Sequence, residues 1–200
     1  MAFLRAFIVF GLTLLSTLTA EAAASPTQVI DGLHQNLLVT MKDAQRLGID
    51  GRYKQLAPVL EQSFDFERMI AAAAGSYWAN ADESQRRRLL IAFVHLSVTT
   101  YAARFNGFSG ESFDVIGERQ GPRDTMLVDT RLNRTDGPPV AITYVLAERE
   151  GTWKIVDVLL DKSISELAVR RSEYNQVLRN GGTESLAQNL DEKAAQMRNE

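Results

Sequence analysis

The chain has 200 residues, and its 22 Lys and Arg against 25 Asp and Glu give a formal net charge of −3. A mildly acidic chain has no overall attraction for nucleic acid or an anionic membrane surface, which argues against both as partners. Apolar residues make up 45% of the chain, enough for the core of one domain, and the absence of cysteine excludes disulfides.

The first 24 residues have the pattern of a secretory signal peptide. Arg5 gives a positive start, an apolar run follows over 7–18, and small residues precede Ser25. The run is shorter than the roughly 20 apolar residues that span a membrane, so an uncleaved anchor is the less favoured alternative. We predict a signal peptide at 1–24 and one exported domain at 25–200. An exported domain of this size without disulfides favours a bacterial periplasm.

Helical periodicity runs through residues 25–106. Apolar spacing, cap residues and the glycines that follow predict four helices, at 26–48, 53–62, 65–74 and 82–105. Asp82 with Gln85 is a capping-box pattern at the start of the last helix. The centre of that helix, residues 89–98, is apolar on every face. It is therefore buried on most sides, or it faces an apolar ligand.

The hydrophobic period changes to 2 in residues 111–160. Four strands are predicted, at 111–119, 124–134, 140–149 and 152–160. The short links between them, one with Asp-Gly at its centre, are typical of an antiparallel meander.

The last two strands are apolar on both faces. In the fourth strand we predict Trp153, Ile155 and Leu159 on one face. Val156, Val158 and Leu160 are predicted on the other. A sheet with one wet face alternates apolar with polar residues, so the second face needs a cover of helices, a partner or a bound apolar molecule.

Helices resume over residues 163–198, with a break at Gly181-Gly182 and Thr183 as the cap of the last helix. Helices, then an antiparallel sheet, then helices again is the α+β class. We predict one α+β domain with a helical part at 25–106, a sheet at 111–160 and C-terminal helices at 163–198.

Common catalytic signatures do not occur in the sequence, and we predict neither a metal nor a cofactor. The two histidines, His34 and His95, lie on different helices, and His95 is expected in the core or on a pocket wall. Asp157, between valines, is the best acid–base candidate, but a structural role beside an arginine or a backbone N–H is favoured. Arg170 and Arg171 either hold an anionic headgroup or form surface salt bridges.

From residue 64 onward the sequence resembles a known family through an ordered series of short motifs. These are Phe64-Asp65-Phe66, Gly75 with Trp78, Gln85-Arg86, Thr100-Tyr101-Ala102, Pro138-Pro139-Val140, Trp153-Lys154-Ile155-Val156-Asp157, and Arg171 with Glu173-Tyr174. The series is similar to the MlaC, or toluene-tolerance auxiliary, protein family. Residues 164–174 resemble its hopanoid-associated branch, HpnM.

The resemblance implies a periplasmic lipid carrier rather than an enzyme. Such a protein has an NTF2-like sheet packed with helices around an apolar cavity that holds the tails of a phospholipid, or of a hopanoid. It acts as a monomer between an inner-membrane ABC transporter complex and an outer-membrane lipoprotein complex. The cavity is expected to be lined by Phe66, Met69, Trp78, Phe93, Leu96, Tyr101, Phe105, Val128, Ile142, Tyr144, Trp153, Ile155 and Val158.

Two other functions remain open from the sequence. NTF2-like folds also include isomerases and dehydratases that act on apolar substrates, and here Asp157 or His95 would be the base. An exported scaffold without a ligand is the third reading. Fold alone does not separate these functions, and the scarcity of paired titratable groups favours the carrier.

Overall fold

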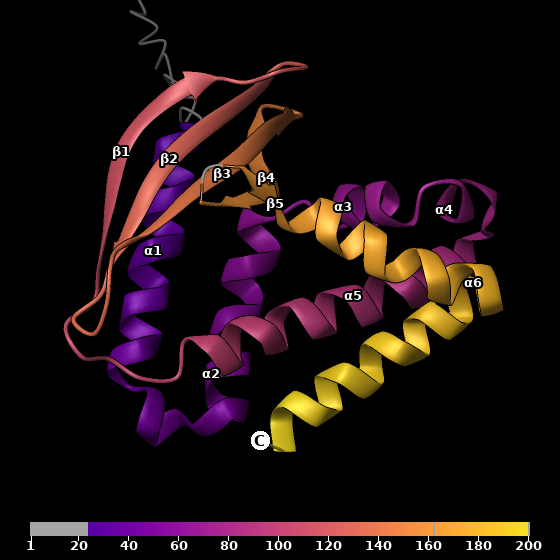
Figure 1. Ribbon diagram of the computed structural model, residues 1–200, viewed down its shortest axis with the longest axis horizontal. Helices are drawn as coiled ribbons and strands as arrows, with labels where there is room; N and C mark the ends of the chain where they lie inside the picture. Colours follow the sequence, from indigo (N-terminus) through magenta and orange to yellow (C-terminus); the bar gives the residue numbers. More distant parts are fainter. Residues whose placement is uncertain (1–23, 162, 200) are drawn as a thin grey trace, which may run out of the picture.

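The computed structural model describes residues 24–161 and 163–199 (Figure 1). All but the last residue of the predicted signal peptide lies outside this part of the chain. The helices are α1 (Pro26–Lys42), α2 (Ala44–Ser63), α3 (Phe66–Ala74), α4 (Ser76–Asn80), α5 (Glu83–Arg104) and α6 (Glu166–Asn199). The strands are β1 (Ser112–Gln120), β2 (Thr125–Asn133), β3 (Val140–Arg149), β4 (Thr152–Leu160) and β5 (Ile164–Ser165). The predicted α+β order is confirmed.

Local side-chain caps fix where three helices begin. The backbone N–H of Gln85 donates to Asp82 Oδ1 over 2.9 Å, and the Gln85 side chain accepts from the Asp82 N–H, completing the predicted capping box of α5. Ser25 and Gln28 form a second capping box at α1, and Asp65 caps α3. These contacts use backbone N–H groups that a helix start leaves unpaired.

The first two helices are divided differently from the prediction. The predicted helix at 26–48 ends at Lys42, and Asp43 leaves helical geometry there. The next helix, α2, continues to Ser63 through Gly48, whose φ of 58° suits glycine. The expected end at Gly48 is therefore a kink inside a longer helix. The short helix α4, after Gly75, was not predicted.

The C-terminal region begins with a strand, which the sequence analysis missed. Ile164 and Ser165 pair with the end of β4, so the helix starts at Glu166 rather than at Ser163. Ser165 Oγ accepts from the N–H of Ala168 over 2.9 Å and acts as the cap of α6. Ser163 and Ser165 are equivalent as cap residues in the sequence, and strand pairing selects the second.

α6 turns sharply at Gly182, where φ is 67° and ψ is −161°. The predicted break at this glycine pair is confirmed, and both halves of α6 run beside α5 (Figure 1). Figure 1 also shows α1 crossing the sheet, while α5 and α6 extend away from it.

The sheet is an antiparallel meander in the order β1-β2-β3-β4-β5, with five strands where four were predicted. A β-bulge in β4 changes which side chains share a face. Val145 pairs with Asp157 and Leu146 with Ile155, so Val156 is an extra residue. Val158 and Leu160 consequently join Ile155 on one face, and the predicted separation of Val158 and Leu160 from Ile155 is wrong.

The opposite face of the sheet is partly covered by its own charged side chains. Arg119 pairs with Asp129 at 2.9 Å, and Arg131 pairs with Asp114 at 3.0 Å. The Thr143 hydroxyl donates to Asp129. The sequence analysis expected a helix, a partner or a bound molecule to cover this face. That expectation was based on the apolar pattern of β3 and β4 alone and did not take the polar outer side chains of β1 and β2 into account.

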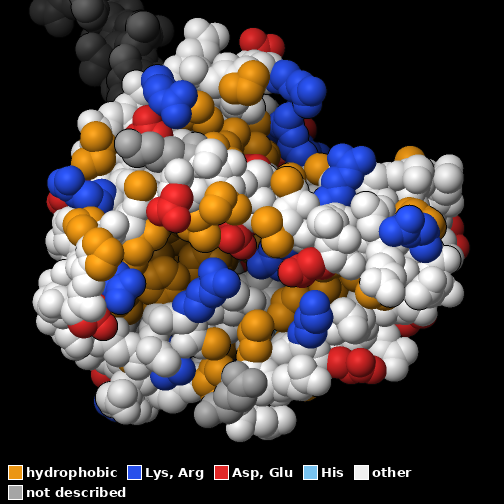
Figure 2. Space-filling model, viewed as in Figure 1, with side chains coloured by type: hydrophobic (Ala, Val, Ile, Leu, Met, Phe, Trp, Pro, Cys, Tyr) orange, Lys and Arg blue, Asp and Glu red, His pale blue; other side chains and the backbone are white. Residues whose placement is uncertain are grey.

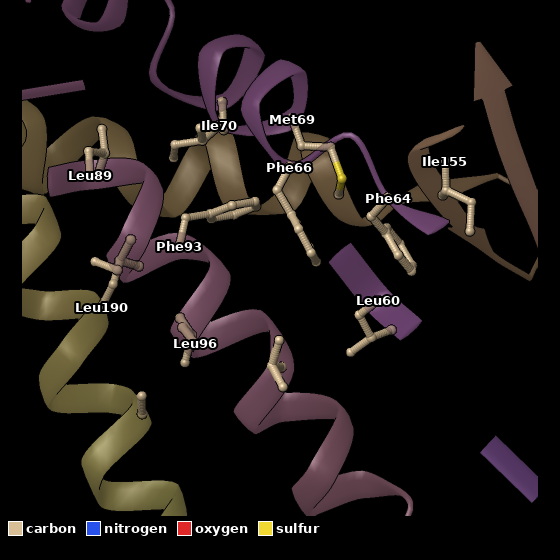
Figure 3. Close-up of a cluster of buried hydrophobic side chains, with 14 of the residues drawn as sticks. Leu60, Phe64, Phe66, Met69, Ile70, Leu89, Phe93, Leu96, Ile155 and Leu190 are labelled. Carbon is tan, nitrogen blue, oxygen red and sulfur yellow. The ribbon is translucent and has the colours of Figure 1, made fainter. Parts of the chain in front are cut away.

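The core is formed by α1, α2, α3, α5 and α6 together with the inner face of the sheet, and α1, α2, α3 and α6 contact the strands directly. Figure 3 shows side chains from α2, α3, α5 and α6 converging with one from β4. The labelled residues are Leu60, Phe64, Phe66, Met69, Ile70, Leu89, Phe93, Leu96, Ile155 and Leu190, and all are buried.

Candidate functional site

A small apolar cavity opens between the sheet, α3, α5 and the start of α6. Its volume is about 120 Å³. Figure 2 shows a hollow with hydrophobic walls where the sheet meets α5, with both basic and acidic side chains around its rim. The lining consists of Phe64, Phe66, Met69, Ser97, Thr100, Tyr101, Arg104, Phe105, Ile142, Tyr144, Val158, Leu160, Glu166 and Arg170.

Aromatic rings form one continuous wall of this cavity. Phe64 stacks on Phe66, with ring centroids 5.4 Å apart, and meets Tyr101 edge-on at 5.8 Å. Tyr101 stacks in turn on Phe105 at 5.6 Å. The backbone N–H of Asp65 donates to the Ile155 carbonyl over 2.9 Å, which holds the link between α2 and α3 against β4. The wall is therefore attached to the sheet by a backbone hydrogen bond.

Polar groups at the inner end of the cavity are paired with each other. The Tyr144 hydroxyl lies 3.1 Å from His34 Nε2, and the His34 ring stacks on Phe113 with centroids 4.0 Å apart. Burial lowers the pKa of His34 to about 4, so the imidazole is neutral at pH 7. Burial also raises the pKa of the Tyr144 phenol. This end of the cavity is uncharged at neutral pH.

Charged side chains in the cavity lining are confined to Arg104, Glu166 and Arg170. Arg170 lies over the Phe93 ring at 5.6 Å and donates to the Tyr174 hydroxyl over 3.3 Å. Burial raises the pKa of Tyr101, and the positive charges of Arg170 and Arg104 partly oppose this shift. Both guanidinium groups therefore act on the same aromatic wall. An apolar interior with two arginines suits an amphiphile with an anionic group.

The structure brings seven of the thirteen predicted residues together in the lining. They are Phe66, Met69, Tyr101, Phe105, Ile142, Tyr144 and Val158. Of the remaining six, Phe93, Val128 and Ile155 are fully buried in the core and not at the cavity surface. Trp78 lies on α4, where the Arg86 guanidinium carbon is 5.9 Å from the centroid of the Trp78 ring. Trp153 is half-buried against the core, and Leu96 lines a neighbouring groove.

Several lining residues were missed by the sequence analysis. Phe64 belongs to the Phe-Asp-Phe motif, which was a signal for it. Leu160 was placed on the wrong face because of the bulge. Nothing in the sequence distinguishes Arg104 or Glu166 from a solvated helix residue.

The two candidate bases of the enzyme reading are not in the cavity lining. Asp157 accepts from the Ser165 hydroxyl over 2.6 Å and from the Leu167 N–H over 3.1 Å. Asp157 therefore has the structural role that was predicted, and its hydrogen-bond donors are a hydroxyl and backbone N–H groups. In the described part of the chain no arginine pairs with Asp157. His95 Nδ1 lies 3.3 Å from Asp191 and borders a different hollow.

That second hollow is larger, about 830 Å³, and lies on the other side of Phe64 and Phe66. Its walls include six charged side chains, which are Glu61, Asp65, Glu67, Arg149, Glu150 and Lys154. We favour the smaller cavity as the functional site because its interior is apolar and its charges are few. Within residues 24–161 and 163–199, acidic and histidine side chains do not cluster as a metal site would require. None of the helices described here has the length and hydrophobicity to cross a bilayer.

Comparisons with known proteins give a family and a fold. The sequence profile of the family described as MlaC protein matches residues 31–192. Among curated proteins, none matches the chain. A solved structure of a phospholipid-binding protein from Ralstonia solanacearum, in complex with a phospholipid, is similar with a TM-score of 0.76. The two sequences are 22% identical, and the match covers 87% of this chain and 99% of that one. At this identity the likeness shows a shared fold.

Proposed function

The chain belongs to the MlaC protein family, and from this premise we propose that it is a lipid-binding carrier and not an enzyme. The observation that carries the proposal is an apolar cavity whose charged side chains include two arginines. Each methylene moved from water into such a cavity gains about 0.8 kcal/mol, which is the driving force for holding a lipid tail. The structural neighbour from Ralstonia solanacearum is described as phospholipid-binding, which supports a phospholipid as ligand.

The cavity widens as it takes up a tail. A volume of about 120 Å³ is small for a long acyl chain. Phe64, Phe66 and Met69 are the side chains that we propose to move, because they border both the cavity and the core. On this proposal the structure is a form of the carrier in which the tail site is only partly open.

The polar headgroup remains at the arginines. Arg104 and Arg170 would donate charge-assisted hydrogen bonds to a phosphate oxygen, while Glu166 limits the local charge excess to one positive unit. Arg171, the other arginine considered from the sequence, is exposed and is not in the lining.

We further propose export to the periplasm after cleavage of residues 1–24. There the monomeric protein would exchange lipid between an inner-membrane ABC transporter complex and an outer-membrane lipoprotein complex. A hopanoid is the alternative ligand. The enzyme alternative has less support, because neither Asp157 nor His95 contributes to the lining.

Mass spectrometry of an organic extract tests the proposal directly. The protein is purified from periplasm, and co-purified phospholipid or hopanoid is expected at a fixed ratio to protein. Val158→Trp should fill the cavity and reduce this ratio, whereas Val39→Trp, at an exposed site on α1, should leave it unchanged. Absence of lipid from the extract, together with no uptake from phospholipid vesicles, would refute the carrier.

A further inference from the structure

A polar hollow lies between α4, the first turn of α5 and the bend of α6. Figure 1 shows α4 beside this bend, at the end of the molecule away from the sheet. We call it the α4–α6 hollow, and its volume is about 270 Å³. It shares no lining residue with the apolar cavity. Its lining is Ser76, Tyr77, Asn80, Ala81, Gln85, Gly181, Gly182, Thr183 and Glu184.

The glycine pair that bends α6 exposes backbone on one wall of the hollow. Glycine has no side chain, so Gly181 and Gly182 line the hollow with backbone atoms alone. Gly182 has a φ of 67°, and a Cβ there would meet no heavy atom within 4 Å. The bend therefore leaves peptide groups uncovered, and such groups both donate and accept hydrogen bonds.

Thr183 brings a buried hydroxyl to the same wall. The side chain is only 8% exposed, and its position after the glycine pair predicted that it caps the last helix. Among the described residues, however, its hydroxyl has no hydrogen-bond partner, and the oxygen is not sealed from solvent. A buried hydroxyl without a partner is unfavourable, so a ligand that bonds to it recovers this free energy.

The remaining polar side chains of the lining also have unused hydrogen-bonding capacity. In the part of the chain that the structure describes, the hydroxyls of Ser76 and Tyr77 and the amide of Asn80 have no partner. Gln85 uses its carbonyl oxygen to accept from the Asp82 N–H, which leaves its NH₂ group free. Hydroxyl and amide groups together offer both donors and acceptors.

Charge in the lining is confined to Glu184, whose carboxylate lies 3.6 Å from Arg88 Nε. A phosphate or carboxylate ligand would therefore meet no cation of the lining. The partly buried Tyr77 ring adds one flat apolar surface. A volume of about 270 Å³ is close to the lower limit for small-molecule pockets, roughly 300 Å³, which limits the ligand to about one ring. An uncharged ring that carries several hydroxyls fits these properties.

We propose that the α4–α6 hollow binds one ring of a neutral saccharide. Sugar hydroxyls would exchange hydrogen bonds with Thr183, Asn80 and Gln85. The apolar C–H face of the sugar would lie on the Tyr77 ring. This site goes beyond lipid binding and does not depend on it. A glycan bound there leaves the apolar cavity free, because the two sites have separate linings.

An NMR titration tests the proposal. Nitrogen-15-labelled protein is titrated with tri-N-acetylchitotriose and, separately, with maltotriose. A site with a few neutral hydrogen bonds is expected to have a Kd of about 1 mM, so each sugar is taken to about 10 mM. We expect amide shifts that saturate with at least one sugar and that are confined to residues 76–85 and 181–184.

Three variants locate the site. Thr183→Val removes the hydroxyl from a side chain of nearly the same size, and it should raise the Kd about fivefold, the effect of one neutral hydrogen bond. Asn80→Ala, at an exposed position that folding does not depend on, should have an effect of similar size. Thr135→Val is the matched control, because Thr135 is exposed and outside the hollow, and it should leave the Kd unchanged.

Three results would overturn the assignment. They are the absence of saturable shifts with both sugars, an unchanged Kd in both Thr183→Val and Asn80→Ala, and equal shifts with the peptide trialanine. The last would make the hollow a peptide site. None of these results affects the proposed lipid carrier, which is tested separately by lipid extraction.

Discussion

Acidification should destabilise the fold through His34, and the size of the effect follows from its burial. His34 is 4% exposed, and burial lowers its pKa from 6.5 to about 4. A histidine whose pKa is lower in the folded state binds a proton more tightly in the unfolded state. The free energy of unfolding therefore has its full value above about pH 6.5 and decreases as the pH falls toward 4. The loss from this one group is about 2 kcal/mol between pH 7 and pH 5, and about 3 kcal/mol by pH 4.

Urea unfolding at several pH values between 7 and 5 measures this loss. The free energy of unfolding of the unaltered protein should decrease by about 2 kcal/mol over this range, and that of His34→Gln should change much less. His95→Gln is the matched control, because it removes the other histidine, which is partly exposed rather than buried, and the decrease of about 2 kcal/mol should persist in this variant. The same slope in His34→Gln as in the unaltered protein would show that His34 is not the buried neutral group described above.

Further predictions concern stability. Asp157→Asn should cost about 1–3 kcal/mol and accelerate amide exchange at the start of α6, and exchange that rises evenly along the chain would contradict this role. Gly182→Ala should lower stability by about 1–2 kcal/mol in thermal unfolding because of its positive φ. Gly32→Ala, inside α1 with open space around it, should raise stability by up to about 1 kcal/mol, and equal effects at the two glycines would argue against the kink. Leu60→Ala should cost about 2–5 kcal/mol by chemical denaturation, against about 0.5 kcal/mol or less for the exposed Ile91→Ala, and a small loss at the first position would place Leu60 outside the core.

Features set by neighbouring residues were predictable from the sequence. The capping box at Asp82 and the glycine-pair break in α6 depend on contacts within a few positions, and the four long strands carry a local hydrophobic period of 2 and are joined by short links. The α+β order followed from them. The family was also predictable, because its motifs are spread along most of the chain in a fixed order.

Features set by contacts between distant segments were not predictable. The bulge at Val156 depends on how β4 pairs with β3, and no residue of β4 alone signals it. It moved Leu160 into the cavity lining. The start of α6 was misplaced because Ser165 is held by Asp157, eight residues earlier on another strand.

Cavity and core residues could not be separated for a similar reason. Phe93 and Phe66 are both buried phenylalanines on helices, yet only Phe66 reaches the cavity. The difference arises from where α3 crosses α5, which determines which side of each helix meets the open space. Arg104 had the appearance of a solvated helix end, and its role depends on the approach of α6.

The attachment of β5 has a consequence for how fast a ligand could exchange. The start of α6, which borders the cavity, is tied to the sheet through the two paired residues of β5 and through Asp157. The second half of α6, beyond Gly182, contributes Leu186, Ala187, Leu190 and Ala194 to the buried core. Regions with few bonds open locally at much lower free energy than the whole domain. Lipid uptake and release would then proceed at the rate of this local opening, many times faster than global unfolding, while the core keeps its packing.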